Sequence, residues 1–287
     1  MGCWTWLLQL LAHCFGWGLF HPPHIIFLGL ITTFAGYTSV YVLNDVIDFK
    51  SDREKVKKGR LNGSGNDLDA VLVRHPMAQG LLSFREGLLW SIAWGLLAVI
   101  GAYLLNPVCL IIFLVSCLLE TIYCLMWRVS PFRTIISGGV KTTGAIAAVF
   151  AVDPDPSPLF VTTLFLCLFL WEVGGQNVPN DWTDIEEDRR FGAKTVPVQF
   201  GIEWSARIML VSLIAAVIMS GTLFYFSQTR FEFWFVLAVL SIGSIFLLFP
   251  CMQLLKNKAP KAAMTLFNKA SYYPMALLTI VLIKIMI

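Results

Sequence analysis

Residues 158–188 read PLFVTTLFLCLFLWEVGGQNVPNDWTDIEED, an apolar run that ends in Asn180, Asp181, Asp184 and Asp188. The same ending, Asn-Asp-x-x-Asp-x-x-x-Asp, closes an earlier apolar run at Asn44, Asp45, Asp48 and Asp52. On a helix, acids at positions i, i+3 and i+7 share one face, where they repel one another unless cations neutralise them. Two such faces at the edge of an apolar cavity predict a site for divalent metal ions and a polyphosphate.

The composition is that of a membrane protein. The chain is 57% hydrophobic and 14% charged, with a mean hydropathy of +0.73, whereas an ordinary globular chain is about 25% charged. A helix that crosses a bilayer takes roughly 20 apolar residues. Nine such segments are expected, at about 4–20, 24–46, 86–105, 107–127, 134–152, 158–178, 205–227, 232–255 and 265–287. The first has no basic residue ahead of it, so we interpret it as a short retained span rather than a signal peptide.

The basic residues predict the orientation of these spans. Most Lys and Arg residues lie in the connections after the second, fourth, sixth and eighth segments. The positive-inside rule places these connections, and the N-terminus, on the cytoplasmic side. Both acidic motifs then lie on that side, at the ends of two spans that run in the same direction. We expect one transmembrane domain over 1–287, with cytoplasmic cap loops at about 49–85 and 181–204.

The six acids suit magnesium. Mg²⁺ prefers carboxylates and water, and it commonly bridges protein acids to substrate phosphates. Six acids exceed the need of one ion, so two or three ions that clamp a diphosphate and stabilise it as a leaving group are expected. The expected catalytic residues and metal ligands are Asp45, Asp48, Asp52, Asp181, Asp184 and Asp188, and the amides of Asn44 and Asn177 are further metal ligands.

Basic residues should complete a diphosphate clamp. The candidates are Lys50, Arg53, Lys57, Arg60, Arg74, Arg128, Arg133 and Lys194. Cytoplasmic loops are basic in any case, because anionic lipids attract them, so topology explains most of these residues. The predicted diphosphate-binding residues are Lys50, Arg53, Arg60, Arg74 and Lys194, with the amides of Asn44 and Asn180.

Ionisable residues inside spans are functional candidates, because a charge in the bilayer is costly. Glu120, Lys141 and Glu172 are the clearest examples, and Asn177 lies one turn before the second motif. We predict that these four residues line the substrate pocket. A structural ion pair between Glu120 and Lys141 is the alternative.

These features together resemble the UbiA superfamily of intramembrane prenyltransferases. Two flanking stretches add to the resemblance, His75-Pro76-Met77-Ala78-Gln79-Gly80-Leu81-Leu82-Ser83 and Gly192-Ala193-Lys194-Thr195-Val196-Pro197-Val198-Gln199-Phe200-Gly201. The resemblance implies an all-helical ring of nine spans around a central cavity open sideways to lipid. It also implies that magnesium on the acids binds an isoprenyl diphosphate, which ionises to an allylic cation and pyrophosphate before an acceptor attacks.

One departure concerns the base after the first motif. Many family members follow this motif closely with Asn-Arg-Pro, whereas here about twenty residues intervene before Arg74-His75-Pro76. Lys57, Arg60 and Arg74 are all candidates for that base.

The sequence therefore predicts a magnesium-dependent prenyltransferase that acts on an isoprenyl diphosphate and a small aromatic or lipid acceptor. A terpene cyclase of the same superfamily is the main alternative; it would cyclise a substrate such as geranylgeranyl diphosphate without an acceptor. A variant that attaches a phosphosugar to a polyprenyl phosphate is a third reading. A transporter is disfavoured because the acids lie at span ends rather than at the bilayer midplane. The lipid bilayer is an expected partner, and nucleic acid is not.

Overall fold

The computed structural model describes residues 23–57, 75–227 and 231–286, and within them it contains helices and loops but no strand. Eight of the described helical segments are long and apolar enough to cross a membrane. They are α2 (Pro23–Ile47), α4 (Phe84–Leu105), α5 (Pro107–Leu125), α6 (Arg133–Val152), α7 (Pro158–Trp171) continued by η1 (Glu172–Asn177) and α8 (Val178–Thr183), α10 (Val196–Tyr225), α11 (Phe233–Gly243) continued by η2 (Ser244–Leu248) and α12 (Phe249–Asn257), and α13 (Pro260–Met286). The predicted all-helical membrane fold is confirmed, while the predicted first span at 4–20 lies outside the described residues.

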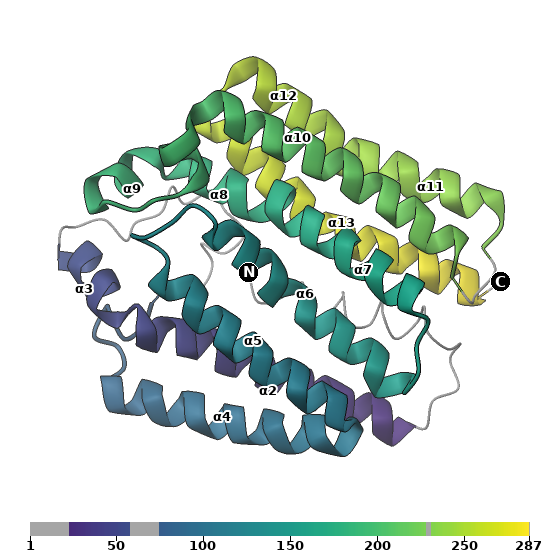
Figure 1. Cartoon of the computed structure of the whole chain (residues 1–287), viewed down its shortest axis with the longest axis horizontal. Coiled ribbons are helices and arrows are strands. Elements are labelled where there is room, and N and C mark those ends of the chain that lie inside the picture. The colour runs from purple at the N-terminus through teal and green to yellow at the C-terminus, as the bar shows by residue number, and fades with distance from the viewer. Residues whose placement is uncertain (1–22, 58–74, 228–230, 287) are drawn as a thin grey trace.

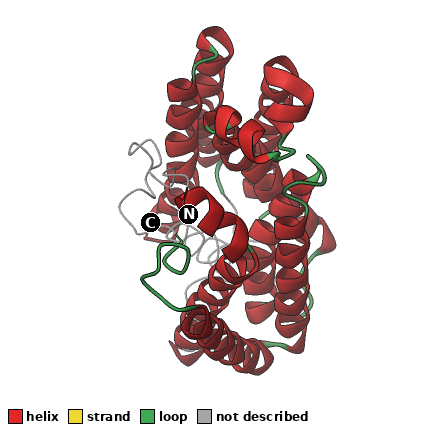
Figure 2. Ribbon diagram, turned by 90° about the vertical axis from the view of Figure 1, so that its left-hand side faces the viewer, coloured by secondary structure: helices red, strands yellow, loops and turns green. Residues whose placement is uncertain are grey.

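The spans pack largely in the order of the chain (Figure 1). Helix α2 packs extensively against α4 and also contacts α5, while α5 packs on α6 and α6 on α7. Helix α10 packs against both α7 and α11, and α13 packs against α8 and α12. Figure 2 shows the same bundle after a quarter turn, with only helices and connecting loops in the described part.

The outer surface is apolar, as a protein in lipid requires. Leu89, Leu104 and Val211 are each more than 60% exposed. Side chains at the centre of the second half of the chain, such as Met209, Leu213 and Leu247, are fully buried. Lipid tails are as apolar as the exposed side chains of Leu89, Leu104 and Val211, so their exposure costs little in a bilayer. The outer faces of these helices are therefore the faces that meet the membrane.

The two acidic motifs do not continue as single helices, and this expectation from their spacing was wrong. Helix α2 ends at Ile47, Asp48 lies in a bend, and the short helix α3 (Phe49–Lys57) follows. Likewise α8 ends at Thr183, Asp184 has φ −111° and ψ 14°, and α9 (Ile185–Phe191) follows. The residues after each break are strongly polar, so they leave the apolar span at the middle acid of the motif.

Two π-helical turns interrupt spans in the second half of the chain. The turn η1 ends two residues before Pro179, and η2 ends two residues before Pro250. A proline inside a helix lacks an N–H donor and clashes with the preceding turn, and a π turn is one way in which the backbone accommodates it. The first of these turns, η1, begins at Glu172 and ends at Asn177, three residues before Asn180 of the second motif.

Candidate active site

Both acidic motifs lie at the same end of the bundle, where α3 and α9 are found (Figure 1). The loop between α5 and α6 contacts both of the segments that contain or follow the last acid of each motif. The Nζ atom of Lys55 in α3 lies 4.3 Å from the ring centre of Trp127. The backbone N–H of Lys194, after α9, donates to the carbonyl oxygen of Trp127 over 2.9 Å. The two motifs therefore flank a common region.

In the first motif, an imidazole lies between two carboxylates. The Nδ1 atom of His75 is 2.9 Å from Oδ1 of Asp45 and 3.0 Å from Oδ2 of Asp52. Asp52 is 3% exposed, and its Oδ1 atom is 3.5 Å from Nζ of Lys55. His75 has a positive φ of 50° and opens the turn that leads to α4. That turn ends in a capping box formed by Ser83 and Glu86.

The acids of the first motif and His75 shift the pKa values of Asp48, Asp52 and His75. Burial acts to lower the pKa of His75, but its hydrogen bonds and charge interactions with Asp45 and Asp52 outweigh burial and raise it to about 9. Burial would raise the pKa of Asp52, yet His75 and Lys55 hold it below its ordinary value. Burial, helped by the negative charge of Asp52, raises the pKa of Asp48 to about 6. Asp45, Asp48 and Asp52 thus repel one another, and the protonated ring of His75 offsets part of this repulsion through Asp45 and Asp52.

The second motif is more deeply enclosed. Asp181 and Asp188 are 8% and 9% exposed, whereas Asp184 is exposed. Thr195 donates from Oγ1 to Oδ2 of Asp188 over 3.0 Å. Burial is the main cause that raises the pKa of Asp188 to about 6, and the charge of Asp184 adds to it. The hydroxyl of Thr195 thus fixes the orientation of Asp188 but only partly offsets its burial.

Two buried acceptor atoms beside this motif are unsatisfied. Within the described part of the chain, Oδ2 of Asp181 and Oδ1 of Asn177 have no hydrogen-bond partner. Asn177 closes η1 and is 6% exposed. A buried polar atom without a partner is costly, so such atoms at a site call for a ligand, an ion or a water. Two inward oxygen atoms, one of them from a carboxylate, fit a hard divalent cation.

Two described basic residues, Arg133 and Lys55, act on acids of both motifs, and Arg133 is the more deeply buried of the two. It begins α6, is 8% exposed, and its guanidinium carbon lies 4.2 Å from the ring centre of Tyr123. Its charge acts on Asp48 of the first motif and on Asp181 and Asp188 of the second. Arg133 is one of the eight candidate bases in the sequence, although it is not among the favoured ones. Its position just after Ser130-Pro131, at the first residue of a span, is the signal that distinguishes it.

The favoured bases lie elsewhere in the described structure. Lys50, Arg53 and Lys194 have exposed side chains. Arg53 lies over the ring of Phe49, with 5.8 Å between its guanidinium carbon and the ring centre. Arg60 and Arg74 lie outside the described residues. Asn180 is half-buried, and its carbonyl oxygen accepts a hydrogen bond from Thr183. The diphosphate-binding assignment of these residues stays a prediction.

The predicted pocket residues form a polar layer beneath the motifs. Asn44 donates from Nδ2 to Oε1 of Glu120 over 2.7 Å. Lys141 donates to the hydroxyl of Tyr41 over 2.9 Å, and Ser137 donates to Oε1 of Glu172 over 3.2 Å. Glu120 and Lys141 therefore take separate hydrogen-bond partners, although Lys141 still interacts electrostatically with Glu172 and Glu120.

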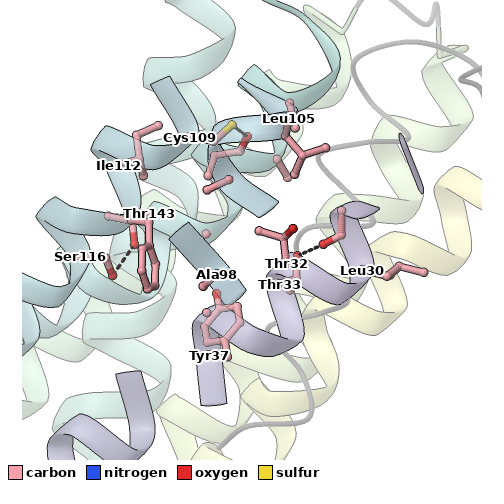
Figure 3. Close-up of a pocket in the computed structure, with 18 of the residues that line it drawn as sticks. Leu30, Thr32, Thr33, Tyr37, Ala98, Leu105, Cys109, Ile112, Ser116 and Thr143 are labelled. Carbon is pink, nitrogen blue, oxygen red and sulfur yellow. Dashed lines mark hydrogen bonds between the residues drawn. The ribbon is translucent and has the colours of Figure 1, made fainter. Parts of the chain in front are cut away.

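A mostly apolar cavity extends away from this layer (Figure 3). Its empty volume is about 1090 Å³, including the space at its mouth, and its described lining comes from α2, α4, α5 and α6. Tyr41 and Lys141 lie at one end, and Ile25 and Val152 lie at the other. Figure 3 shows Ser116 and Thr143 as a hydrogen-bonded pair on its wall, at 3.0 Å. Since Tyr41 lies one helical turn before Asp45, the cavity ends directly beneath the first motif.

The fold and the site define a multi-pass membrane protein with paired aspartate motifs at one end of an apolar cavity. The chain belongs to the UbiA prenyltransferase family, whose profile matches residues 5–272. It is similar to a digeranylgeranylglyceryl phosphate synthase of Thermococcus sibiricus, with 29% identity over 77% of this chain and 71% of the relative. It is also similar to a protoheme IX farnesyltransferase of Alkalihalophilus pseudofirmus, with 26% identity over 76% of this chain and 74% of the relative.

Solved structures share the fold. A UbiA homologue from Aeropyrum pernix K1 superposes with a TM-score of 0.71 at 16% identity, covering 98% of this chain and 96% of that chain. A UbiA homologue from Archaeoglobus fulgidus bound to DMAPP and Mg²⁺ gives a TM-score of 0.68 at 18% identity, with coverage of 98% and 96%. The helix arrangement of this chain is therefore the arrangement of its family.

Proposed function

We propose that this chain is a magnesium-dependent intramembrane prenyltransferase. It ionises an isoprenyl diphosphate and transfers the prenyl group to a small aromatic or lipid acceptor. The observation that carries this proposal is the convergence of both aspartate motifs and Arg133 at the end of an apolar cavity. The homologue that binds Mg²⁺ with DMAPP, and the relatives named as prenyltransferases, support it.

The residues present fit a hard divalent cation. Asp45, Asp48 and Asp52 would hold metal on the first side, and Asp181, Asp184, Asp188 and Asn177 on the second. The unsatisfied oxygens of Asp181 and Asn177 support this assignment, because both are buried acceptors without a partner among the described residues. When bound, Mg²⁺ neutralises phosphate charge and stabilises the departing diphosphate. Two or three ions remain the proposed number.

The amide of Asn44 has a defined part in this site. Its nitrogen is committed to Glu120, so its oxygen is the atom left for a metal or an orienting contact. Asn180 would contribute a further amide on the second side.

Arg133 is the proposed diphosphate partner. Its guanidinium presents several N–H donors in a planar fork, which matches two phosphate oxygens at once. Within the described residues, its buried Nε atom has no hydrogen-bond partner. The Tyr123 ring beneath the guanidinium holds the group in place. Lys50, Arg53 and Lys194 would reach the diphosphate from the exposed side of the site.

The cavity is the proposed site of the prenyl chain. Small-molecule pockets are mainly apolar, and apolar side chains make up most of the lining of this cavity. Tyr41 and Lys141 line the end of the cavity that lies next to the first motif, and the charges of Glu120 and Glu172 act on Lys141. These four residues would lie near the reacting end of the prenyl group and the acceptor. A cyclase needs no polar acceptor site, and this buried polar layer therefore favours the transferase.

The proposal is tested with purified protein, Mg²⁺ and a series of prenyl diphosphates. Pyrophosphate release and the organic products would be measured first without an acceptor and then with a membrane extract or aromatic acids. A prenylated adduct that needs an acceptor supports the transferase, and a cyclic hydrocarbon or alcohol formed without one would establish the cyclase. Asp45→Ala and Asp181→Ala should abolish turnover without unfolding the protein. Near-normal turnover in either folded variant would contradict the metal assignment.

A further inference from the structure

The ligand set of the first motif is not made of oxygen alone. The described residues hold a group of three potential metal ligands, Asp45, Asp52 and His75, whose ligand atoms all lie within 4.8 Å of one another. The imidazole nitrogen Nδ1 is 2.9 Å from Oδ1 of Asp45 and 3.0 Å from Oδ2 of Asp52. A nitrogen ligand changes which metal ions a site prefers.

Both short contacts are made by the same nitrogen atom of His75. The contact between Nδ1 and Asp45 has hydrogen-bond geometry. Nδ1 carries at most one hydrogen, so the two carboxylates compete for it, and the contact with Asp52 is an ion pair with the protonated ring. Among the described residues, Oδ2 of Asp52 has no hydrogen-bond partner, although Asp52 is only 3% exposed. One proton shared with two carboxylates leaves a net negative charge on the three groups, which a divalent cation in place of that proton would neutralise.

The spacing of the three groups also fits a coordination site. Protein ligands bind small divalent ions in octahedral geometry at roughly 2.1 Å, so neighbouring ligand atoms lie about 3.0 Å apart. The two N···O separations at His75 match that edge length. One ion on the far side of both contacts would satisfy Asp45, Asp52 and His75 together.

We infer that Asp45, Asp52 and His75 form a mixed oxygen and nitrogen site for a divalent transition-metal ion such as Mn²⁺. This inference deepens the proposed function and rests on it, because the site is one half of the proposed metal clamp. Imidazole suits transition metals, whereas Mg²⁺ prefers oxygen ligands. The first motif therefore binds Mn²⁺ more tightly than Mg²⁺. The second motif, with Asp181, Asp188 and Asn177, offers oxygen ligands only and keeps a magnesium-like preference.

The position of His75 is built into the fold. It lies 30 residues after Asp45 in sequence, and the turn that follows it is fixed by hydrogen bonds from the N–H groups of Gln79 and Leu81 to the carbonyls of His75 and Pro76. The side chain of Lys55 approaches the other oxygen of Asp52 at 3.5 Å and so helps to set the orientation of that carboxylate. Supporting contacts of this kind orient metal ligands.

The test uses Mn²⁺ as the probe and tag-free full-length protein in detergent. Electron spin-echo modulation detects ligand nitrogen bound to Mn²⁺ without any turnover. Wild-type protein should show ¹⁴N coupling, which changes to the ¹⁵N pattern when histidine is ¹⁵N-labelled. His75→Gln should abolish the coupling and lower Mn²⁺ affinity roughly tenfold or more, while Mg²⁺ affinity changes less. His24→Gln is the matched control, since His24 is exposed at the far end of α2.

The labelling measurement needs no variant, so misfolding of His75→Gln would not hide the answer. Absence of nitrogen coupling in wild-type protein, or coupling that survives His75→Gln, would overturn the mixed site. Magnesium-dependent pyrophosphate release in that case would leave the proposed function standing. Failure to bind either ion, together with metal-independent turnover, would instead overturn the proposed function.

Discussion

The amide nitrogen of Asn44 lies 2.7 Å from Oε1 of Glu120, which joins the first aspartate motif to the middle of the bundle. Glu120 is 6% exposed and lies on α5. Because this contact holds the amide nitrogen inward, it leaves the amide oxygen of Asn44 available to the site. Glu120 therefore acts on the motif through Asn44.

Replacing Glu120 should test that relationship. Glu120→Ala removes the oxygen acceptor and leaves the amide nitrogen with its weaker contact to Sγ of Cys124, at 3.2 Å. Hydrogen bonds to charged groups are worth about 1.5–3 kcal/mol. We expect kcat/KM to fall by roughly tenfold to a hundredfold. Glu120→Gln keeps an acceptor oxygen at the same place and should retain most of the activity. Equal losses in the two variants would show that the charge of Glu120, rather than its contact with Asn44, is what matters.

Arg133 should be the most sensitive basic residue of the site. Removing one donor that stabilises developing charge typically lowers the rate about 10²–10³-fold. Arg133→Gln should lower kcat/KM by that order, and inhibition by pyrophosphate should weaken in parallel. Arg128→Gln is the matched control, because Arg128 is 49% exposed and pairs with Glu54 of the neighbouring helix α3. Comparable losses in both variants would indicate a general effect of positive charge at this end of the protein.

The pKa of His75 predicts how stability depends on pH when metal is removed by a chelator. In the folded protein this pKa is about 9, whereas an unfolded chain has about 6.5. The resulting stabilisation is fully present below about pH 6.5 and is lost as the pH rises through 9. A shift of this size is worth at most about 3 kcal/mol. Thermal unfolding followed by tryptophan fluorescence should show this loss in wild-type protein, and His75→Gln should flatten the profile between these two pH values.

The sequence carries the information that is local, and the spans are the clearest case. Apolar runs of sufficient length predict α4, α5 and α6 to within a few residues. The breaks at Asp48 and Asp184 are less visible, because the spacing of the acids alone fits an unbroken helix. They depend on where each span leaves the apolar layer, which is a property of the folded bundle.

Contacts between distant segments are harder still to predict. His75 meets Asp45 and Asp52 across a connection whose length differs from the family pattern, so no spacing rule predicts the contact. Its place at the start of a span is the one sequence signal for Arg133, and its burial over the ring of Tyr123 is visible only in the folded bundle. Tertiary packing, rather than residue type, decides which charges meet.

The far end of the cavity predicts a limit on prenyl chain length. Gly29 lines the cavity, and a Cβ atom added there would meet no described atom within 4 Å. Twelve residues of α2 separate Gly29 from Tyr41, a distance of about 18 Å along the helix. Gly29→Phe should therefore obstruct a long chain whose reacting end lies beside Tyr41, while a short chain ends before the obstruction.

Competition between substrates measures this effect directly. A clash with a bulky side chain costs about 1–3 kcal/mol, so Gly29→Phe should lower kcat/KM for geranylgeranyl diphosphate roughly tenfold. The value for geranyl diphosphate should change little, because the shorter chain does not reach Gly29. Gly29→Ala adds only the Cβ atom and should leave both values unchanged. Equal losses for the two diphosphates in Gly29→Phe would show that the chain does not run along α2 toward Gly29.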